Sequence, residues 1–381
     1  PDAPGGPADQ PFLAPLAPRS APASAYLLRY GPDGWEVDCG TAHGLREGAG
    51  AAEFTVADAE PDTAAPGGLV LWARDVRMER TLVDPVGWVP DRALVYPVVV
   101  SALALAQGGV RLAGPADAVR ELAEAVGPLP SLRVVDGPER AAGLELRVRV
   151  AEREAHVERR DGTPFTAPLP YGGDGDVSRV ARCLEHLTRW HEIRDLAPRP
   201  SPLDGLVRVE IAPWNAAPGE VLLPDGGGEI VCPYTPGPDG PEAPLVSIRL
   251  HNRSLDRTLW CLLLDLTDRY ACHSVLYPGH FIGPGRTGHV LDGDPVRLSL
   301  PQGRPVAPGA QTRDWLKLIV AERELNTLPF QLPAWDPYAA PVSRDLGPVL
   351  GAAPGRWTTL TVPLRTLVPA QGAEPVTGPG A

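Results

Sequence analysis

The chain has 381 residues, of which 43% are hydrophobic, and a formal net charge of −12. This length is enough for two or three domains with real cores, and the negative charge argues against a surface that binds nucleic acid or anionic lipid. Because the sequence contains neither a signal peptide nor an apolar run of membrane-spanning length, we expect a cytoplasmic protein with no membrane partner.

The first part of the sequence predicts a linker followed by a small barrel. Residues 1–24 are rich in Pro, Ala and Gly, and we expect them to form a flexible linker. Since the chain starts at Pro1 rather than at Met, we interpret it as a fragment or a processed product. Residues 25–95 contain strand-like runs such as LVLWARDV, separated by turn residues, which together predict a small β-barrel of five or six strands.

Residues 96–200 predict an α+β domain. Apolar spacing indicates a helix over residues 115–126. Strands are expected at 132–135, 144–150 and 154–159. The strongest helical pattern follows. Asp176 or Ser178 can cap this second helix, which carries a long apolar stripe and ends before Pro198.

Residues 201–340 predict an antiparallel β-sandwich. Leu245 to His251 alternates apolar and polar residues, so one face of this strand should be buried. Thr258 to Leu266 is apolar on both sides and too short to span a membrane, which favours a central strand. Val296 to Leu300 and Trp315 to Val320 are two further strand-like runs. Turns recurring about every ten residues are typical of a sandwich or barrel.

The C-terminal extension, residues 341–381, adds one possible strand. Trp357 to Leu364 reads WTTLTVPL, and Pro363 favours a place at a sheet edge because proline cannot donate a ladder hydrogen bond. The predicted fold class is therefore mainly β with an α+β middle: a small β-barrel, an α+β domain, then an antiparallel β-sandwich.

The cysteine pattern indicates reduced thiols. The five cysteines are an odd number and include no C-x-x-C pair; they are Cys39, Cys183, Cys232, Cys261 and Cys272. We expect most to be buried and free, with a single disulfide as the alternative. Because no Cys, His or carboxylate cluster has ligand spacing, the sequence predicts neither a metal nor an organic cofactor.

Two pairs of potentially reactive residues stand close in sequence. Cys39 and His43 flank a glycine-containing turn and could form a nucleophile and base, although an ordinary tight turn is the favoured interpretation. His186 and His191 lie on the second helix, five residues apart rather than four, so their imidazoles should not share one face as a metal site requires. The glycines at 226–228 precede a strand and are interpreted as a hairpin tip rather than a phosphate loop.

Several longer strings resemble a known family. The run SIRLHNRSLDRTLWCLLLDLTDRY, then VLYPG, DGDPVRLSLPQG and DWLKLIVAERELNTLPFQL, is similar to the all-β accessory domain found downstream of caspase-like peptidase domains in actinobacterial proteins. It also resembles bacterial sandwich domains with an N-x-S…L-D…L-Y-P pattern. Upstream, RCLEHLTRWHEIRDLAPRPSPLDGLVRVEI and DCGTAHGLREGAGAAEFTV resemble the helix and the small barrel of such proteins. The resemblance covers most of residues 25–335.

One string within that region invites a catalytic interpretation. DRYACHS, residues 268–274, is similar to the D-x-C-H-S-G string of metacaspases, which would make Cys272 a nucleophile with His273 or His280 as base. Val275 stands where the family has glycine, and His251 lacks the glycine that follows the catalytic histidine. We therefore favour a strand turn and assign no catalytic residue, keeping Cys272, His273, Cys39 and His43 as the weaker candidates.

The resemblance implies a non-catalytic role. We expect the accessory, regulatory or target-binding part of a bacterial caspase-like cysteine protease, whose partners would be the catalytic domain or subunit and a protein or peptide ligand. Two alternatives stay open. The chain could be a cysteine hydrolase in its own right, using Cys272 or Cys39 with a nearby histidine, or a scaffold component of a bacterial defence or signalling complex.

Overall fold

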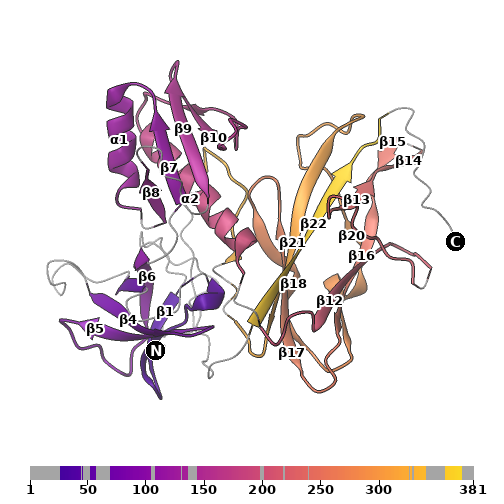
Figure 1. The fold of residues 1–381 in the computed structure, drawn as a ribbon, viewed down its shortest axis with the longest axis horizontal. Coiled ribbons are helices and arrows are strands. Elements are labelled where there is room, and N and C mark those ends of the chain that lie inside the picture. Colours follow the sequence, from indigo (N-terminus) through magenta and orange to yellow (C-terminus); the bar gives the residue numbers. More distant parts are fainter. Residues whose placement is uncertain are drawn as a thin grey trace, which may run out of the picture.

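The computed structural model is mainly β, which confirms the predicted fold class. It describes residues 26–43, 45, 52–56, 69–103, 108–129, 131–135, 144–197, 201–217, 219–238, 240–325, 327, 330–339 and 357–370. The predicted linker at 1–24 lies outside these ranges. Figure 1 shows the barrel and the α+β part on one side of the long helix α2 and the sandwich on the other. Within the described ranges, neither α-helix is long and apolar enough to cross a membrane.

The N-terminal part is a closed six-stranded barrel in the order β1-β2-β5-β4-β3-β6. Its strands are β1 (Tyr26–Gly31), β2 (Gly34–Val37), β3 (Ala52–Val56), β4 (Val70–Val76), β5 (Thr81–Val86) and β6 (Tyr96–Leu103). The strand β6, which we placed in the α+β stretch, pairs with both β1 and β3 and so closes the barrel. The reason is geometric, because a barrel leaves no free edge only when its last strand meets its first.

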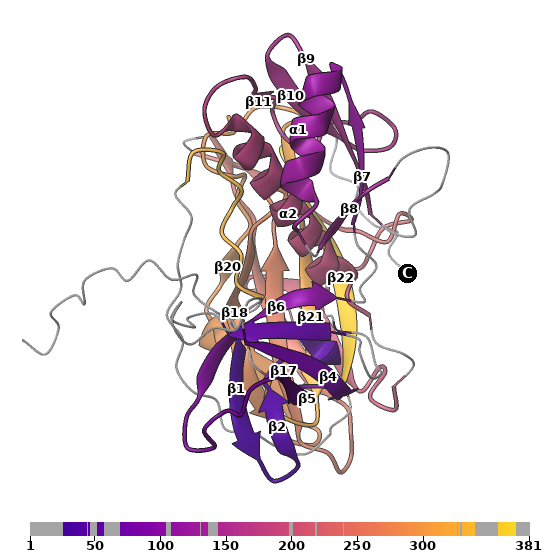
Figure 2. The same cartoon turned by 90° about the vertical axis from the view of Figure 1, so that its left-hand side faces the viewer.

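The middle part is a mixed five-stranded sheet in the order β11-β10-β9-β7-β8, with two helices. Its elements are β7 (Gly108–Ala113), α1 (Ala116–Val126), β8 (Leu132–Val134), β9 (Glu145–Ala151), β10 (Glu154–Glu158), β11 (Leu169–Pro170) and α2 (Asp176–Asp195). The connection through α1 makes β7 and β8 parallel, while β9 and β10 form an antiparallel hairpin. Figure 2 shows both helices beside this sheet, above the barrel.

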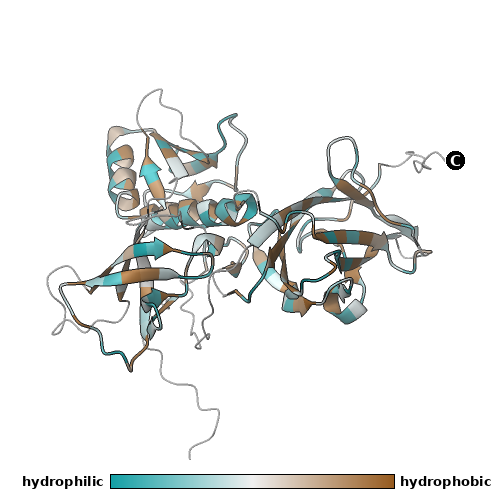
Figure 3. Cartoon of the chain, turned by 60° about the horizontal axis from the view of Figure 1, so that its bottom comes forward, coloured by the Kyte–Doolittle hydropathy of each residue, from teal (hydrophilic) through white to brown (hydrophobic). Residues whose placement is uncertain are grey.

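The C-terminal part is a two-sheet sandwich. One sheet is formed by β12 (Val207–Pro213), β16 (Leu245–Asn252), β19 (Thr287–His289) and β20 (Val296–Arg297). The other has the order β13-β22-β21-β17-β18, with β13 (Ile230–Pro233), β22 (Trp357–Leu367), β21 (Gln311–Ala321), β17 (Leu259–Leu266) and β18 (Cys272–Ile282). A small hairpin pairs β14 (Thr235–Gly237) with β15 (Gly240–Glu242). Figure 3 shows hydrophobic residues running along the sandwich strands.

The strand β22 departs in part from its prediction as an edge strand. It pairs with β21 along its whole length, and β13 joins it in parallel only at Leu364–Leu367. The segment around Pro363 therefore lies at the sheet edge, as expected from its missing N–H, and the following residues are interior. This strand of the C-terminal extension belongs to the sandwich.

The helix α2 joins the three parts. A single apolar cluster contains Leu184 and Trp190 of α2 together with side chains of the middle sheet, Met78 beside the barrel, and Trp260 of β17. The opposite face of β17 contributes Cys261 and Leu263 to the separate core between the two sandwich sheets. The strand is thus buried on both faces, as its sequence predicts, because one face packs in the sandwich and the other on α2.

The start of α2 differs from the expected cap. The N-cap is Gly175, which adopts the left-handed conformation at φ 79° and has no side chain that could accept a capping hydrogen bond. Asp176 is the first helical residue, and its carboxylate accepts a hydrogen bond from the amide of Gly173 at 2.8 Å. The acidic side chain consequently fixes the preceding turn instead of capping the helix.

Candidate binding sites in the β-sandwich

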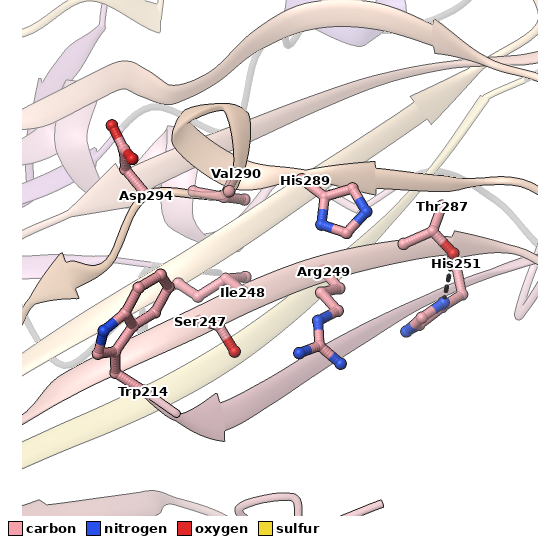
Figure 4. Close-up of a pocket in the computed structure, with 10 residues that line it drawn as sticks. Trp214, Ser247, Ile248, Arg249, His251, Thr287, His289, Val290 and Asp294 are labelled. Carbon is pink, nitrogen blue, oxygen red and sulfur yellow. Dashed lines mark hydrogen bonds between the residues drawn. The ribbon is translucent and has the colours of Figure 1, made fainter. Parts of the chain in front are cut away.

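A polar cavity of about 340 Å³ lies on the outer face of the sheet β12-β16-β19. Alternation along β16 places Val246, Ile248 and Leu250 in the sandwich core, so the residues between them point outward. Figure 4 shows the outward side chains with those from neighbouring elements around the cavity: Trp214, Ser247, Arg249, His251, Thr287, His289 and Asp294. The sequence predicted the alternation of β16, and the sheet register adds His289 directly across from Arg249.

Two side chains that line this outer cavity, Arg249 and His251, lie beside the Glu210 carboxylate of the neighbouring strand β12. The Arg249 guanidinium lies 3.1 Å from Glu210 Oε1, and His251 Nε2 lies 3.3 Å from Glu210 Oε2. The second contact is an ion-pair distance rather than an aligned hydrogen bond. His251 Nδ1 is hydrogen bonded to Thr287 Oγ1 at 2.9 Å. The order of carboxylate, imidazole and hydroxyl is that of a hydrolytic triad, but these residues are cross-strand neighbours, and such polar pairs stabilise sheets generally.

A second cavity of about 340 Å³ opens at one end of the sandwich, between its two sheets. It is lined by apolar side chains such as Leu276, Leu316 and Leu364, and by the polar groups of Asp265, Thr312 and Asp314. Leu263 of β17 and Leu316 of β21 point into the sandwich core. Because residues two apart on a strand share a face, Asp265, Asp314 and Thr312 point inward as well. We call this space the end cavity.

The two carboxyl groups of the end cavity are strongly perturbed. Burial raises the pKa of Asp265 to about 6. Burial, followed by the charges of Asp265 and Asp268, raises the pKa of Asp314 to about 7, although the Asp268 amide and Arg304 act in the opposite direction. Thr312 is only 3% exposed, and its Oγ1 makes no hydrogen bond within the described part of the chain. Buried polar atoms are usually satisfied, so the Thr312 hydroxyl is exceptional.

The predicted pair Cys39 and His43 is buried next to the barrel. The thiol of Cys39 is fully buried, and burial raises its pKa well above the usual value. His43 Nδ1 accepts a hydrogen bond from the Gly40 amide at 3.1 Å, and its ring stacks on Phe330 at 5.8 Å between centroids. A nucleophile needs an exposed thiol with a lowered pKa, which this environment does not supply.

The string DRYACHS forms the turn between β17 and β18. Cys272 is fully buried in the cluster around α2, and burial raises its pKa to about 12. His273 is exposed and lines the end cavity, because neighbouring residues of a strand point to opposite faces. His280, eight positions after Cys272 on the same strand, is also exposed, with its ring against Tyr277. The fold thus separates the thiol and imidazole that sequence places side by side.

The same turn fastens the sandwich to α2. Tyr270 adopts a positive φ of 59° and donates its hydroxyl hydrogen bond to the Phe165 carbonyl at 2.9 Å. His186 Nε2 donates to the Tyr270 carbonyl at 2.8 Å, and Trp190 donates to the Ala271 carbonyl at 3.0 Å. The residues resembling a catalytic string therefore serve an interface between two parts of the chain.

The histidines of α2 act separately. His191 Nδ1 donates to the Leu187 carbonyl at 2.7 Å, and burial lowers its pKa to about 4. Burial also lowers the pKa of His186. No group of three or more His, Cys, Asp or Glu residues able to hold a metal occurs among the residues that the structure describes.

The sequence reasoning missed the end cavity. Its signals were single acidic residues inside apolar runs: Asp265 in LWCLLLDL and Asp314 before WLKLIV. A buried position for a lone carboxyl is costly, so such an interruption can mark either a strand end or a site. In comparisons with protein-family models, curated protein sequences and solved structures, nothing matches this chain.

Proposed function

We propose that this chain is a non-catalytic, polypeptide-binding accessory part of a bacterial caspase-like cysteine protease. The observation that carries the proposal is the burial of all five thiols; they are Cys39, Cys183, Cys232, Cys261 and Cys272. A cysteine peptidase needs a thiolate that its substrate can reach, and buried thiols act as small apolar side chains. The link to caspase-like proteins rests on the sequence resemblance described above.

The placement of polar cavities on the sandwich supports a binding role. Both cavities are of a size that can hold a side chain or a small polar group. They lie on the sandwich, while α2 and its apolar cluster connect the sandwich to the other two parts. A ligand bound to the sandwich would therefore be held at a fixed position relative to the barrel and the middle sheet.

Thiol reactivity and peptide hydrolysis test the non-catalytic role. We expect no hydrolysis of a fluorogenic peptide panel by this chain, and alkylation of its cysteines by iodoacetamide below pH 7 only after unfolding. Hydrolysis that is lost in Cys272→Ala or Cys39→Ala would overturn the proposal in favour of a cysteine hydrolase. Cys232→Ala serves as the matched control, because this buried cysteine is not a catalytic candidate.

Partner capture tests the binding role. We expect the chain to retain a caspase-like catalytic domain or subunit from the cell that produces it, and to alter its peptidase activity when the two are mixed. Capture of other proteins without any effect on a peptidase would instead favour the scaffold of a defence or signalling complex.

A further inference from the structure

The end cavity combines acidic groups with an unpaired hydroxyl. Asp265 and Asp314 reach it from adjacent strands, and the charge of each disfavours ionisation of the other. Thr312, two residues before Asp314 on the same face of β21, lines the cavity and is almost fully buried, and its Oγ1 has no hydrogen-bond partner in the described part of the chain. Since an unpaired buried hydroxyl and two repelling carboxyls all destabilise the fold, the arrangement needs a reason other than stability.

The three groups match the donors of one ammonium ion. Lysine carries three N–H donors and no acceptor, while ionised Asp265 and Asp314 and the Thr312 hydroxyl supply three acceptors. A metal ion fits less well, since the described residues contain no cluster of three metal-ligating side chains. The apolar lining, including Leu276, Leu316 and Leu364, suits the aliphatic stem of a lysine.

The lysine must come from outside the chain. Lys317 is the only lysine in the sequence. It is 1% exposed on the opposite face of β21, where its Nζ donates to the Arg194 carbonyl at 2.6 Å. Lys317 is thus committed to another contact.

We propose that the end cavity binds a lysine side chain of a partner polypeptide, with Asp265, Thr312 and Asp314 accepting the three hydrogen bonds of its ammonium group. This inference rests on the proposed polypeptide-binding function and names the chemistry of one recognised residue. In the complex, the ammonium group would place a positive charge beside two carboxyls whose ionisation is disfavoured by burial.

The charged residues around the end cavity determine which residues should flank the recognised lysine. His273, Arg269 and Arg297 line the cavity with exposed side chains, and Arg304 is paired with Asp268 at 2.7 Å. Positive charge at the rim disfavours a polybasic segment, so the recognised lysine should stand among neutral or acidic residues. Because the pKa values of Asp265 and Asp314 are raised to about 6 and 7, binding of an ammonium group should release protons below pH 8 and strengthen as the pH rises toward that value.

The test uses fluorescein-labelled pentapeptide libraries with a fixed central residue: lysine, Nε-acetyl-lysine, arginine or norleucine. Fluorescence anisotropy with the whole chain at pH 8 should show the lysine library binding roughly 10-fold or more tightly than the acetyl-lysine library. Asp314→Asn and Thr312→Val should reduce this preference, and a shift to pH 5 should weaken it. Asp117→Asn, which removes an exposed carboxylate from α1 and lines neither cavity of the sandwich, is the matched control and should change nothing.

A second probe separates the inference from the proposed function. Monodansylcadaverine carries a primary ammonium on an aliphatic stem without any peptide. If the peptide libraries bind equally well whatever their central residue, or if Asp314→Asn keeps the lysine preference, the lysine site is overturned while polypeptide binding stands. If monodansylcadaverine binds in an Asp314-dependent manner but no library binds, the ammonium site stands and the polypeptide-binding function is overturned. Preference for arginine over lysine would also contradict the inference. Circular dichroism confirms that each variant is folded.

Discussion

Lys317 and Asp314 lie three residues apart on β21 and point to opposite faces of the same sheet. Lys317 faces α2, where its Nζ donates to the Arg194 carbonyl at the end of the helix and lies 3.3 Å from Thr361 Oγ1. Asp314 faces the end cavity and forms no ion pair within the described part of the chain. The Lys317 ammonium is hydrogen bonded inside the protein, whereas the Asp314 carboxyl faces a cavity in which burial disfavours its charge, and such a group marks a candidate place for a ligand.

The largest effect is expected from Lys317→Ala. This change leaves the Arg194 carbonyl without its donor and removes a buried aliphatic stem between α2 and the sandwich. We expect the free energy of unfolding to fall by about 2–4 kcal/mol. Urea unfolding at pH 7 measures this, with Lys317→Met as a control that keeps the stem and should lose less. An unchanged midpoint for Lys317→Ala would show that this contact does not fasten the helix.

The opposite sign is expected for Asp314→Asn. Removing the charge relieves both the burial penalty and the repulsion from Asp265, so the free energy of unfolding at pH 8 should rise by about 1–3 kcal/mol. At pH 4 the gain should vanish, because the wild-type carboxyl is then protonated. Thermal unfolding at both pH values checks this prediction. A loss of stability at pH 8 would contradict the interpretation that the ionised Asp314 carboxylate destabilises the fold.

The groups on the two faces of β21 should also change the free energy of unfolding in opposite directions as the pH rises. Asp265 and Asp314 have folded pKa values of about 6 and 7, above the usual 3.8. Between the usual value of 3.8 and these folded values, the folded state holds protons that the unfolded state has lost. The contribution of the two carboxyls to stability therefore falls as the pH rises from 4 to 7. Burial lowers the pKa of Lys317 to about 8 from 10.5. Between these values the unfolded state holds the extra proton, so the contribution of Lys317 to stability rises from pH 8 toward 10.

Urea unfolding of the wild type and of both variants from pH 4 to 10 measures these contributions as differences between the proteins, with an acidic limb from pH 4 to 7 and an alkaline limb from pH 8 to 10. Asp314→Asn should flatten the acidic limb and Lys317→Met the alkaline limb. If neither variant changes its own limb, other groups dominate the titration.

The smallest effect is expected in the outer cavity. Glu210→Gln removes the carboxylate shared by Arg249 and His251, but the Arg249 side chain is 43% exposed and water can replace its partner. The free energy of unfolding should therefore change by no more than about 1 kcal/mol. The lysine preference of the end cavity should be unaffected. A large loss of stability would place a structural charge network on this face.

Periodicity in the sequence predicted much of the framework. The alternation from Leu245 to His251 identified the buried and outward faces of β16, and the doubly apolar run from Thr258 to Leu266 identified β17 as central. The long stripe on α2 was also visible. These features could be predicted because side chains return to the same face every 2 residues in a strand and every 3.6 residues in a helix. Apolar residues at the buried positions therefore recur with that period.

The closure of the barrel and the chemistry of the sites could not be read in this way. The pairing of β6 with β1 joins residues about seventy positions apart, and no local pattern encodes it. The outer cavity needs Thr287 and His289 from β19 beside β16, a register that only the assembled sheet fixes. The nearness of Cys272 to His273 in sequence was misleading as evidence of a reactive pair, because strand geometry directs them to opposite faces.

The sequence by itself placed Lys317 on a strand predicted from Trp315 to Val320. The observed strand, Gln311–Ala321, also contains Asp314, and because their separation is odd the two residues occupy opposite faces. Only the tertiary structure decided what each face meets. The carbonyl at the end of α2 covers Lys317, whereas the gap between two sheet ends leaves Asp314 beside Asp265 and Thr312. A buried charged residue can stabilise the fold or form a binding site. Which of the two it does depends on the groups that distant parts of the chain bring to it, because those partners set the free energy of its ionised form.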